Sequence, residues 1–150
     1  MPDPGPMTAD ALIRALALQP HPEGGHYRQT WVADAAPGQR PSGTAILFLL
    51  KAGEASHWHR VDAAEIWHFH AGAPLILRTA ATDQGPVEAR ILGPDVLAGE
   101  HPQLIVPPHH WQSATTTGAF TLVGCTVSPG FRFEGFTLAP PGFEIPARGG

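Results

Sequence analysis

Short apolar runs separated by glycine and proline constrain the fold of this chain more than any other feature. Among its 150 residues are 17 glycines and 17 prolines, and much of this excess lies at the two ends and between the apolar runs. Runs broken so often by turn residues are typical of short strands rather than of long helices. The pattern predicts about ten strands in one all-β antiparallel sandwich or barrel, and such a barrel can enclose a pocket for one small ligand.

One short helix is expected before the strands. Thr8 is suited to cap it, and Leu12, Ile13 and Leu16 recur at helical spacing up to about Leu18. We expect a single domain over residues 8–143, with flexible tails at 1–7 and 144–150. The predicted strands are 26–32, 44–50, 56–60, 64–70, 74–81, 86–92, 103–106, 111–115, 119–127 and 136–138.

Charge and cysteine content exclude several classes of protein. The formal net charge is −4 and Lys51 is the single lysine, so there is no basic stripe for nucleic acid. The single cysteine, Cys125, cannot form an intrachain disulfide, and its apolar surroundings predict a buried small hydrophobe in a reducing compartment. No apolar run has membrane-spanning length, and no signal-peptide pattern opens the chain. We therefore expect a cytoplasmic protein without nucleic-acid or membrane partners.

The segment 56–65 carries the strongest chemical signal. His57 and His59 are separated by one residue, so on a strand both side chains are expected to face the same side. Glu65 follows a short turn and could return on the neighbouring strand to face them. Two imidazoles and a carboxylate can hold a divalent metal with open positions, or serve as acid, base and anchor without one.

The strand that contains Glu65 has two distinct faces. Trp67 and Phe69 share the face of Glu65 and are expected to line the pocket with it, because side chains alternate along a strand. The alternate positions point outward, into a second layer or a subunit contact. The sequence leaves open the roles of four other histidines, which are His68, His70, His109 and His110.

The segment 21–28 is the other unusual stretch. Its Gly24-Gly25 pair permits backbone dihedrals closed to other residues, or a close approach to a ligand. Arg28 and Arg60 could clamp a carboxylate or phosphate, although Arg28 could equally form a structural ion pair at the barrel rim. The segment gathers an acid, a phenol and a guanidinium, which are Glu23, Tyr27 and Arg28.

Two motifs resemble those of the cupins. Gly53-x3-His57-x-His59-x5-Glu65-x6-Gly72 is similar to the first cupin motif, with a shorter first gap and a longer gap before Glu65. The segment 107–112 aligns with the second motif, but Gln112 stands where the last metal-binding His belongs. A neutral amide oxygen is a weaker ligand than imidazole for borderline metals, so the resemblance implies a weak site for an unidentified divalent metal.

A more specific resemblance is to the cupin 5 family of small cupins. Its motifs occur in order as His21-Pro22-Glu23-Gly24-Gly25-His26-Tyr27-Arg28, Ser56-x-Trp58-His59-Arg60, Glu65-Ile66-Trp67-His68-Phe69, Val106-Pro107-Pro108-x-x-Trp111-Gln112 and Val123-Gly124-Cys125-Thr126-Val127-Ser128-Pro129-Gly130-Phe131. The resemblance implies a jelly-roll barrel, usually a homodimer, without an established reaction. It supports His59 and Glu65 more firmly than His57.

Three functions remain open at this point. The first is a metal-dependent enzyme on a small polar, carbohydrate-like substrate, with the metal held by His57, His59, Glu65 and Gln112. The second is a metal-free isomerase or epimerase, with a His as base and Tyr27 as acid. The third is a non-catalytic binding or storage protein. The residues expected to contact the small-molecule ligand are Glu23, Arg28, Arg60, Trp67, Phe69 and Trp111. A homodimer is expected because the strand 44–50 is too apolar to leave one face in water.

Overall fold

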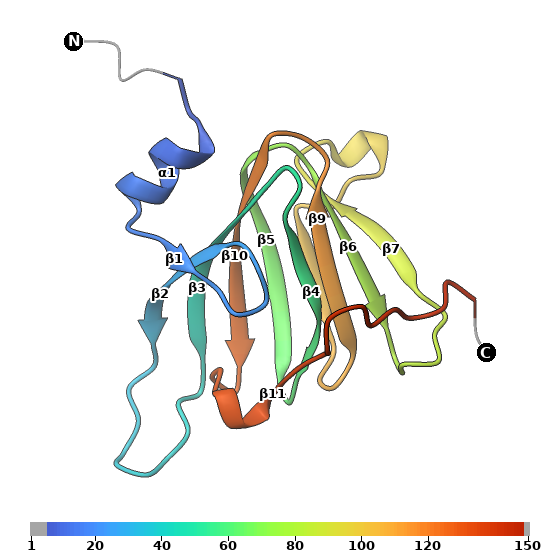
Figure 1. Cartoon of the computed structure of the whole chain (residues 1–150). Helices are drawn as coiled ribbons and strands as arrows, with labels where there is room; N and C mark the ends of the chain where they lie inside the picture. Colours follow the sequence, from blue (N-terminus) through green and yellow to red (C-terminus); the bar gives the residue numbers. More distant parts are fainter. Residues whose placement is uncertain (1–5, 149–150) are drawn as a thin grey trace.

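A computed structural model describes residues 6–148 and shows two antiparallel sheets facing each other in a jelly roll (Figure 1). The expected tail residues 1–5 and 149–150 lie outside the described part. Sheet A has, in spatial order, β1 (Gln19–Pro20), β2 (His26–Val32), β3 (Thr44–Lys51), β10 (Phe120–Ser128), β5 (Ala64–Gly72) and β8 (Gln103–Val106). Sheet B has β11 (Phe136–Leu138), β4 (Ala55–Val61), β9 (Trp111–Thr116), β6 (Leu75–Ala80) and β7 (Glu88–Leu92).

The prediction of an all-β barrel with a short N-terminal helix is confirmed. The helix α1 spans Ala9–Ala15, and the Thr8 side chain caps it by accepting from the Ala11 amide. It ends earlier than expected because Ala17 adopts a φ of 54°, which an α-helix cannot continue. The sequence pattern did not predict β1 or the two short 3-10 helices, η1 (Val96–Ala98) and η2 (Phe133–Gly135).

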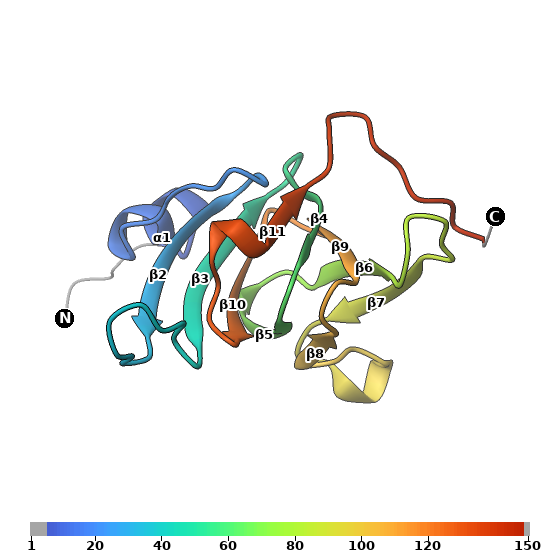
Figure 2. The same ribbon diagram turned by 90° about the horizontal axis from the view of Figure 1, so that it is seen from below.

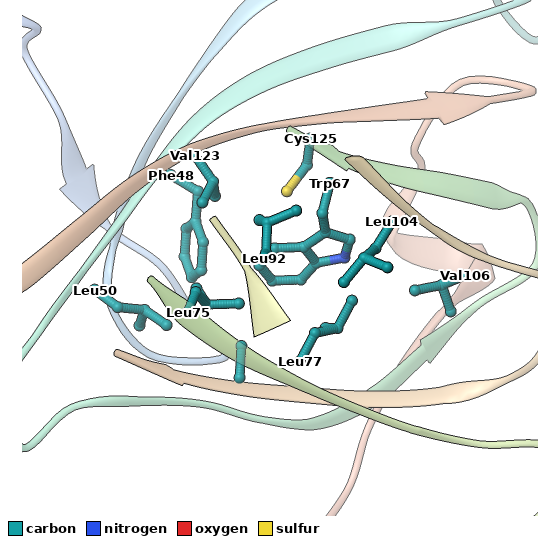
Figure 3. Packing of buried hydrophobic residues seen from close by; sticks show 11 residues of the cluster. Phe48, Leu50, Trp67, Leu75, Leu77, Leu92, Leu104, Val106, Val123 and Cys125 are labelled. Atoms are coloured by element: carbon teal, nitrogen blue, oxygen red, sulfur yellow. The ribbon is translucent and has the colours of Figure 1, made fainter. Parts of the chain in front are cut away.

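The core fills the space between the sheets. Trp67 lies among leucines from both sheets with Cys125 beside it, as Figure 3 shows. On the outer face of sheet A, Leu49 and Leu122 are buried in a second cluster with residues of α1. The strand 44–50 is therefore covered on its inner face by the core and on part of its outer face by α1, which explains its continuous apolar sequence.

The outer face of sheet A also carries a row of side chains that α1 does not cover. Strand register places Trp31, Ala45, Thr126, Ile66 and Ile105 side by side across β2, β3, β10, β5 and β8. The end residues are well exposed, at 53% for Trp31 and 58% for Ile105. We call these five residues the outer row.

Residues 139–147, which we call the C-terminal strap, pass over the outer face of sheet B (Figure 2). The Ala139 amide donates to the Trp58 carbonyl oxygen at 3.0 Å, and the Val87 amide donates to the Ala147 carbonyl oxygen at 3.3 Å. Ile145 is buried in a cluster with Trp58. The expectation of a flexible tail from residue 144 is therefore corrected for the described residues, because apolar side chains dock this segment onto the sheet.

Candidate functional site

A cavity of about 120 Å³ opens between the sheets, bordered by β2, β3, β4, β5, β10 and η2. We call it the barrel cavity. Its ionisable lining consists of His21, Glu23, His59, Glu65, Tyr27 and Cys125. A further part of the lining is an aromatic rim of Phe131, Phe133 and Phe136, which follow β10.

Glu23 reaches the barrel cavity through a tight loop between β1 and β2. Gly24 has a φ of 109°, and a Cβ there would collide with the Ala55 carbonyl oxygen. The His57 amide donates to the Glu23 carbonyl oxygen at 2.8 Å, which fastens this loop to β4. The two glycines thus permit close approach to another strand rather than to a ligand.

Glu23 and His59 form a buried pair in the cavity wall. Glu23 Oε2 lies 3.2 Å from His59 Nε2, and the Ser56 hydroxyl donates to Glu23 Oε1 at 2.8 Å. His59 Nδ1 lies 2.7 Å from the His57 carbonyl oxygen, which can only accept. In the neutral imidazole the proton therefore resides on Nδ1, and Nε2 offers a lone pair to Glu23.

Burial favours the neutral forms of both partners. Desolvation raises the pKa of Glu23, against the opposing effect of His21, and desolvation lowers the pKa of His59. The raised pKa of Glu23 and the lowered pKa of His59 agree with the Nδ1–H tautomer of His59, because a protonated Glu23 can donate to the free Nε2 of the neutral ring. The pair thus holds one acid proton between Oε2 and Nε2. Burial likewise lowers the pKa of His21, whose Nδ1 accepts from the Glu23 amide at 3.0 Å.

Glu65 is held by a chain of hydrogen bonds from the core. The Trp67 indole donates to Gln112 Oε1 at 2.7 Å, and Gln112 Nε2 donates to Glu65 Oε1 at 2.9 Å. An indole N–H can only donate, so it fixes the orientation of the Gln112 amide with its NH2 group toward Glu65. Desolvation raises the pKa of Glu65 to about 7, with Glu23 adding to the effect and His59 opposing it.

Cys125 also lines the barrel cavity. It is buried, as predicted, and desolvation raises the pKa of its thiol well above the usual range. A thiol in this state is not a nucleophile, because nucleophilic attack requires the thiolate. Glu65 and Glu23 add to the raised pKa of this thiol, which places it within the same group of ionisable residues.

The structure brings together four of the sequence-predicted site residues: Glu23, Tyr27, His59 and Glu65 all line the barrel cavity. His57 does not line the barrel cavity, so the expectation that it faces the same side as His59 is wrong. The register of β4 against β9 shifts between Ser56 and His59, as at a β-bulge. His57 and Trp58 both line the space beneath the C-terminal strap, and His57 Nε2 lies 2.9 Å from the Pro140 carbonyl oxygen.

The remaining predicted ligand-contact residues lie elsewhere. Arg28 is exposed on β2, and the Arg60 guanidinium lies 4.8 Å from the centre of the Trp111 ring, so the two arginines form no clamp at the cavity. Trp67 and Phe69 do share the face of Glu65, but they pack in the core and do not line the cavity. Trp111 is buried on the opposite face of sheet B, against Phe143 of the strap.

The predicted metal ligands do not form a set in this structure. His57 faces away from the cavity, and the Gln112 oxygen is already bonded to the Trp67 indole. Within residues 6–148 no three His, Cys, Asp or Glu side chains are grouped in a way that could hold a metal ion. Glu23 Oε2 and His59 Nε2 are directed at each other at 3.2 Å, and among the described residues no third His, Cys, Asp or Glu joins them in such a group.

Sequence reasoning assigned no role to His21, Ser56 or the aromatic rim. The signal for His21 and Glu23 was the compact segment 21–25, in which two consecutive glycines mark a forced backbone approach. The rim lies in a loop whose position depends on Asp62, which binds Arg40 at 2.7 Å and Arg132 at 3.1 Å. No local pattern in the sequence indicates that long-range contact.

Comparison with known proteins agrees with this architecture. Over residues 10–139 the sequence matches the cupin 5 family, described as Cupin superfamily (DUF985). The chain belongs to the cupin 5 family. Protein SO0799 from Shewanella oneidensis is 40% identical to this cupin, with a TM-score of 0.84 and coverage of 89% of this chain and 85% of that one. A hypothetical protein from Leishmania major is 31% identical, with a TM-score of 0.79 and coverage of 89% and 88%.

A more distant likeness concerns the fold alone. Oxalate decarboxylase from Bacillus subtilis is 14% identical to this cupin, with a TM-score of 0.60, and the match covers 79% of this chain and 29% of that one. None of the curated proteins compared with this cupin matches it. Within residues 6–148 no helix is both long and apolar enough to cross a membrane.

Proposed function

We propose that this cupin binds a small polar molecule in the barrel cavity and transfers protons on it without a metal, as an isomerase or epimerase does. The observation that carries the proposal is the placement of two differently connected acids in one cavity. Glu23 shares a proton with His59, whereas Glu65 accepts from Gln112 and has a pKa of about 7. A pKa near the working pH suits a group that must both take and return a proton.

The two acids suit a reaction next to a carbonyl group. Ionised Glu65 takes a proton from the carbon beside the carbonyl, while the proton held between Glu23 and His59 passes to the carbonyl oxygen. The product of this step is an enediol. The hydroxyl on the carbon that lost its proton then gives its own proton to the Glu23–His59 pair, and Glu65 gives a proton to the former carbonyl carbon. Both groups are then restored, and an aldose and a ketose have been interconverted.

The structure changes the roles that the sequence favoured. Both ring nitrogens of His59 are engaged, so Glu65 rather than a histidine is the proposed base. Tyr27 lines the cavity and is retained as a group that orients the substrate oxygen. The Mn(II) centres of Bacillus subtilis oxalate decarboxylase keep metal-dependent chemistry as the rival proposal, but the paired donors of this cupin support it less well.

The test is proton exchange at carbon in D2O. Chelator-treated protein is incubated with three- to six-carbon aldoses and ketoses, and loss of the α-proton signal is followed by NMR. We expect exchange that persists in EDTA, is abolished in Glu65→Gln and is unchanged in Glu88→Gln, since Glu88 is exposed on β7. Absence of exchange across the panel, or exchange that EDTA abolishes, would reject the proposal.

A further inference from the structure

The barrel cavity is lined by two acidic side chains, Glu23 and Glu65. Among residues 6–148, neither a lysine nor an arginine joins them in this lining. Three arginines near the rim and the turn after β4 are engaged elsewhere: Arg40 and Arg132 both bind Asp62, and Arg60 lies over the Trp111 ring. A phosphate or carboxylate bound in the cavity would lose its hydration and would face two acidic side chains. The imidazoles of His21 and His59 would not compensate its charge, because burial lowers their pKa and favours their neutral forms.

The mouth of the cavity adds a second feature that selects for charge. Phe131 lies 5.0 Å from Phe133 and 5.7 Å from Phe136 between ring centres, and each pair is edge-to-face. Phe136 also lies 5.6 Å from the His59 ring, so the rim reaches the buried pair. Aromatic faces carry negative potential and attract ammonium groups, most strongly where water is excluded.

We infer that the substrate of the barrel cavity carries a positively charged nitrogen, as in a small amino sugar or amino ketone. The ammonium group would face ionised Glu65, with its carbon atoms against the aromatic rim. The inference rests on the proposed function, because the substrate still needs the carbonyl group and the neighbouring hydroxyl group on which the proton transfer acts. A cavity of about 120 Å³ holds on the order of six non-hydrogen atoms, so a larger substrate would extend through the rim.

A cationic nitrogen also fits the proposed chemistry. Its charge favours the ionised form of Glu65, which is the form that takes the proton. When it is attached beside the reacting carbon, it also stabilises the negative charge that develops there. The same feature disfavours a phosphate or carboxylate group inside the cavity itself, because the described lining offers it neither lysine nor arginine.

The experiment compares three probes of similar size and different charge: ethanolamine, ethylene glycol and glycolate. Binding to chelator-treated protein in EDTA is followed through the Trp67 indole N–H resonance, which Gln112 connects to Glu65 and which Trp67→Phe identifies. Ionic strength is matched with sodium chloride. We expect ethanolamine to bind at least about tenfold more tightly than either other probe.

Two variants locate the charge selectivity. Glu65→Gln should weaken ethanolamine binding about tenfold while leaving ethylene glycol unchanged, and the surface variant Glu88→Gln should bind as the unmodified protein does. Phe136→Leu keeps an apolar rim but removes a ring, and should weaken ethanolamine alone.

The outcomes separate this inference from the function on which it rests. Equal binding of ethanolamine and ethylene glycol, tightest binding of glycolate, or no binding of any probe would overturn the inference. If proton exchange on neutral sugars were still observed together with any of these three binding results, the proposed function would remain supported while the inferred charge of the substrate would be rejected. Selective ethanolamine binding without exchange on any neutral or amino sugar would support the charge selectivity and reject the proton transfer.

Discussion

Glu65→Gln should remove a loss in the free energy of unfolding that the unmodified protein undergoes as the pH rises from about 4.5 to about 7. Glu65 is buried at 7% exposure, and this burial raises its pKa from an ordinary 4.5 to about 7. In the unfolded chain the same carboxyl ionises near 4.5, so folding between these two pH values requires it to take up a proton. Glutamine has nearly the same shape and no charge, and it can still accept a hydrogen bond from Gln112.

The sign and size of the effect follow from the two pKa values. The stabilising contribution of a carboxyl with a raised pKa is complete below pH 4.5, falls as the pH rises toward 7, and stays low above that. At about 1.4 kcal/mol per pH unit, the loss amounts to about 3 kcal/mol. We therefore expect Glu65→Gln to gain about 3 kcal/mol relative to the unmodified protein between pH 4.5 and pH 8.

The measurement is urea unfolding followed by tryptophan fluorescence at several pH values across this range. Glu23 and His59 titrate in both proteins, so the difference between the two unfolding free energies reports Glu65 together with its coupling to these two residues. Glu88→Gln is the control, because an exposed carboxyl should show no comparable trend. A difference between Glu65→Gln and the unmodified protein that stays within about 0.5 kcal/mol at all pH values would refute the reasoning.

Two further predictions concern the core and the assembly. Gln112→Leu leaves the Trp67 indole without an acceptor, and Trp67→Phe leaves the amide oxygen without a donor, so each should cost about 1–3 kcal/mol in unfolding free energy. The double variant should cost less than the sum, and additivity within about 0.5 kcal/mol would argue against the bond. The outer row should be buried in a homodimer, because Trp31 and Ile105 are exposed on one face of sheet A. Sedimentation should give a dimer mass at micromolar concentration and a monomer mass for Ile105→Lys, and a monomer for the unmodified protein would contradict this expectation.

Most of the fold could be predicted because its signals are local. Turn residues mark the strand ends, and alternation with period two places Trp67 on the face of Glu65 and His68 on the opposite face. Thr8 begins the helix as an N-cap residue should. Each of these features depends on a few neighbouring residues, so a single sequence is enough to show it.

The candidate site was only half predictable because its geometry depends on contacts that are distant in sequence. Strict alternation fails in β4, where the bulge between Ser56 and His59 turns His57 outward. The partner of His59 comes from the loop before β2, and the orientation of Gln112 depends on Trp67 from another sheet. Periodicity cannot reveal a bulge, and it cannot show which distant acid faces a given histidine.

His57 connects the interior of the barrel to its exterior although it lies outside the barrel cavity. Its side chain contacts Pro140, its carbonyl oxygen positions the His59 ring, and its amide holds the Glu23 loop. The family match ends at residue 139, and His57 is one residue through which the strap beyond it contacts the segment that holds Glu23 and His59. A change in the strap can therefore shift the Glu23–His59 pair without replacing any residue that lines the barrel cavity.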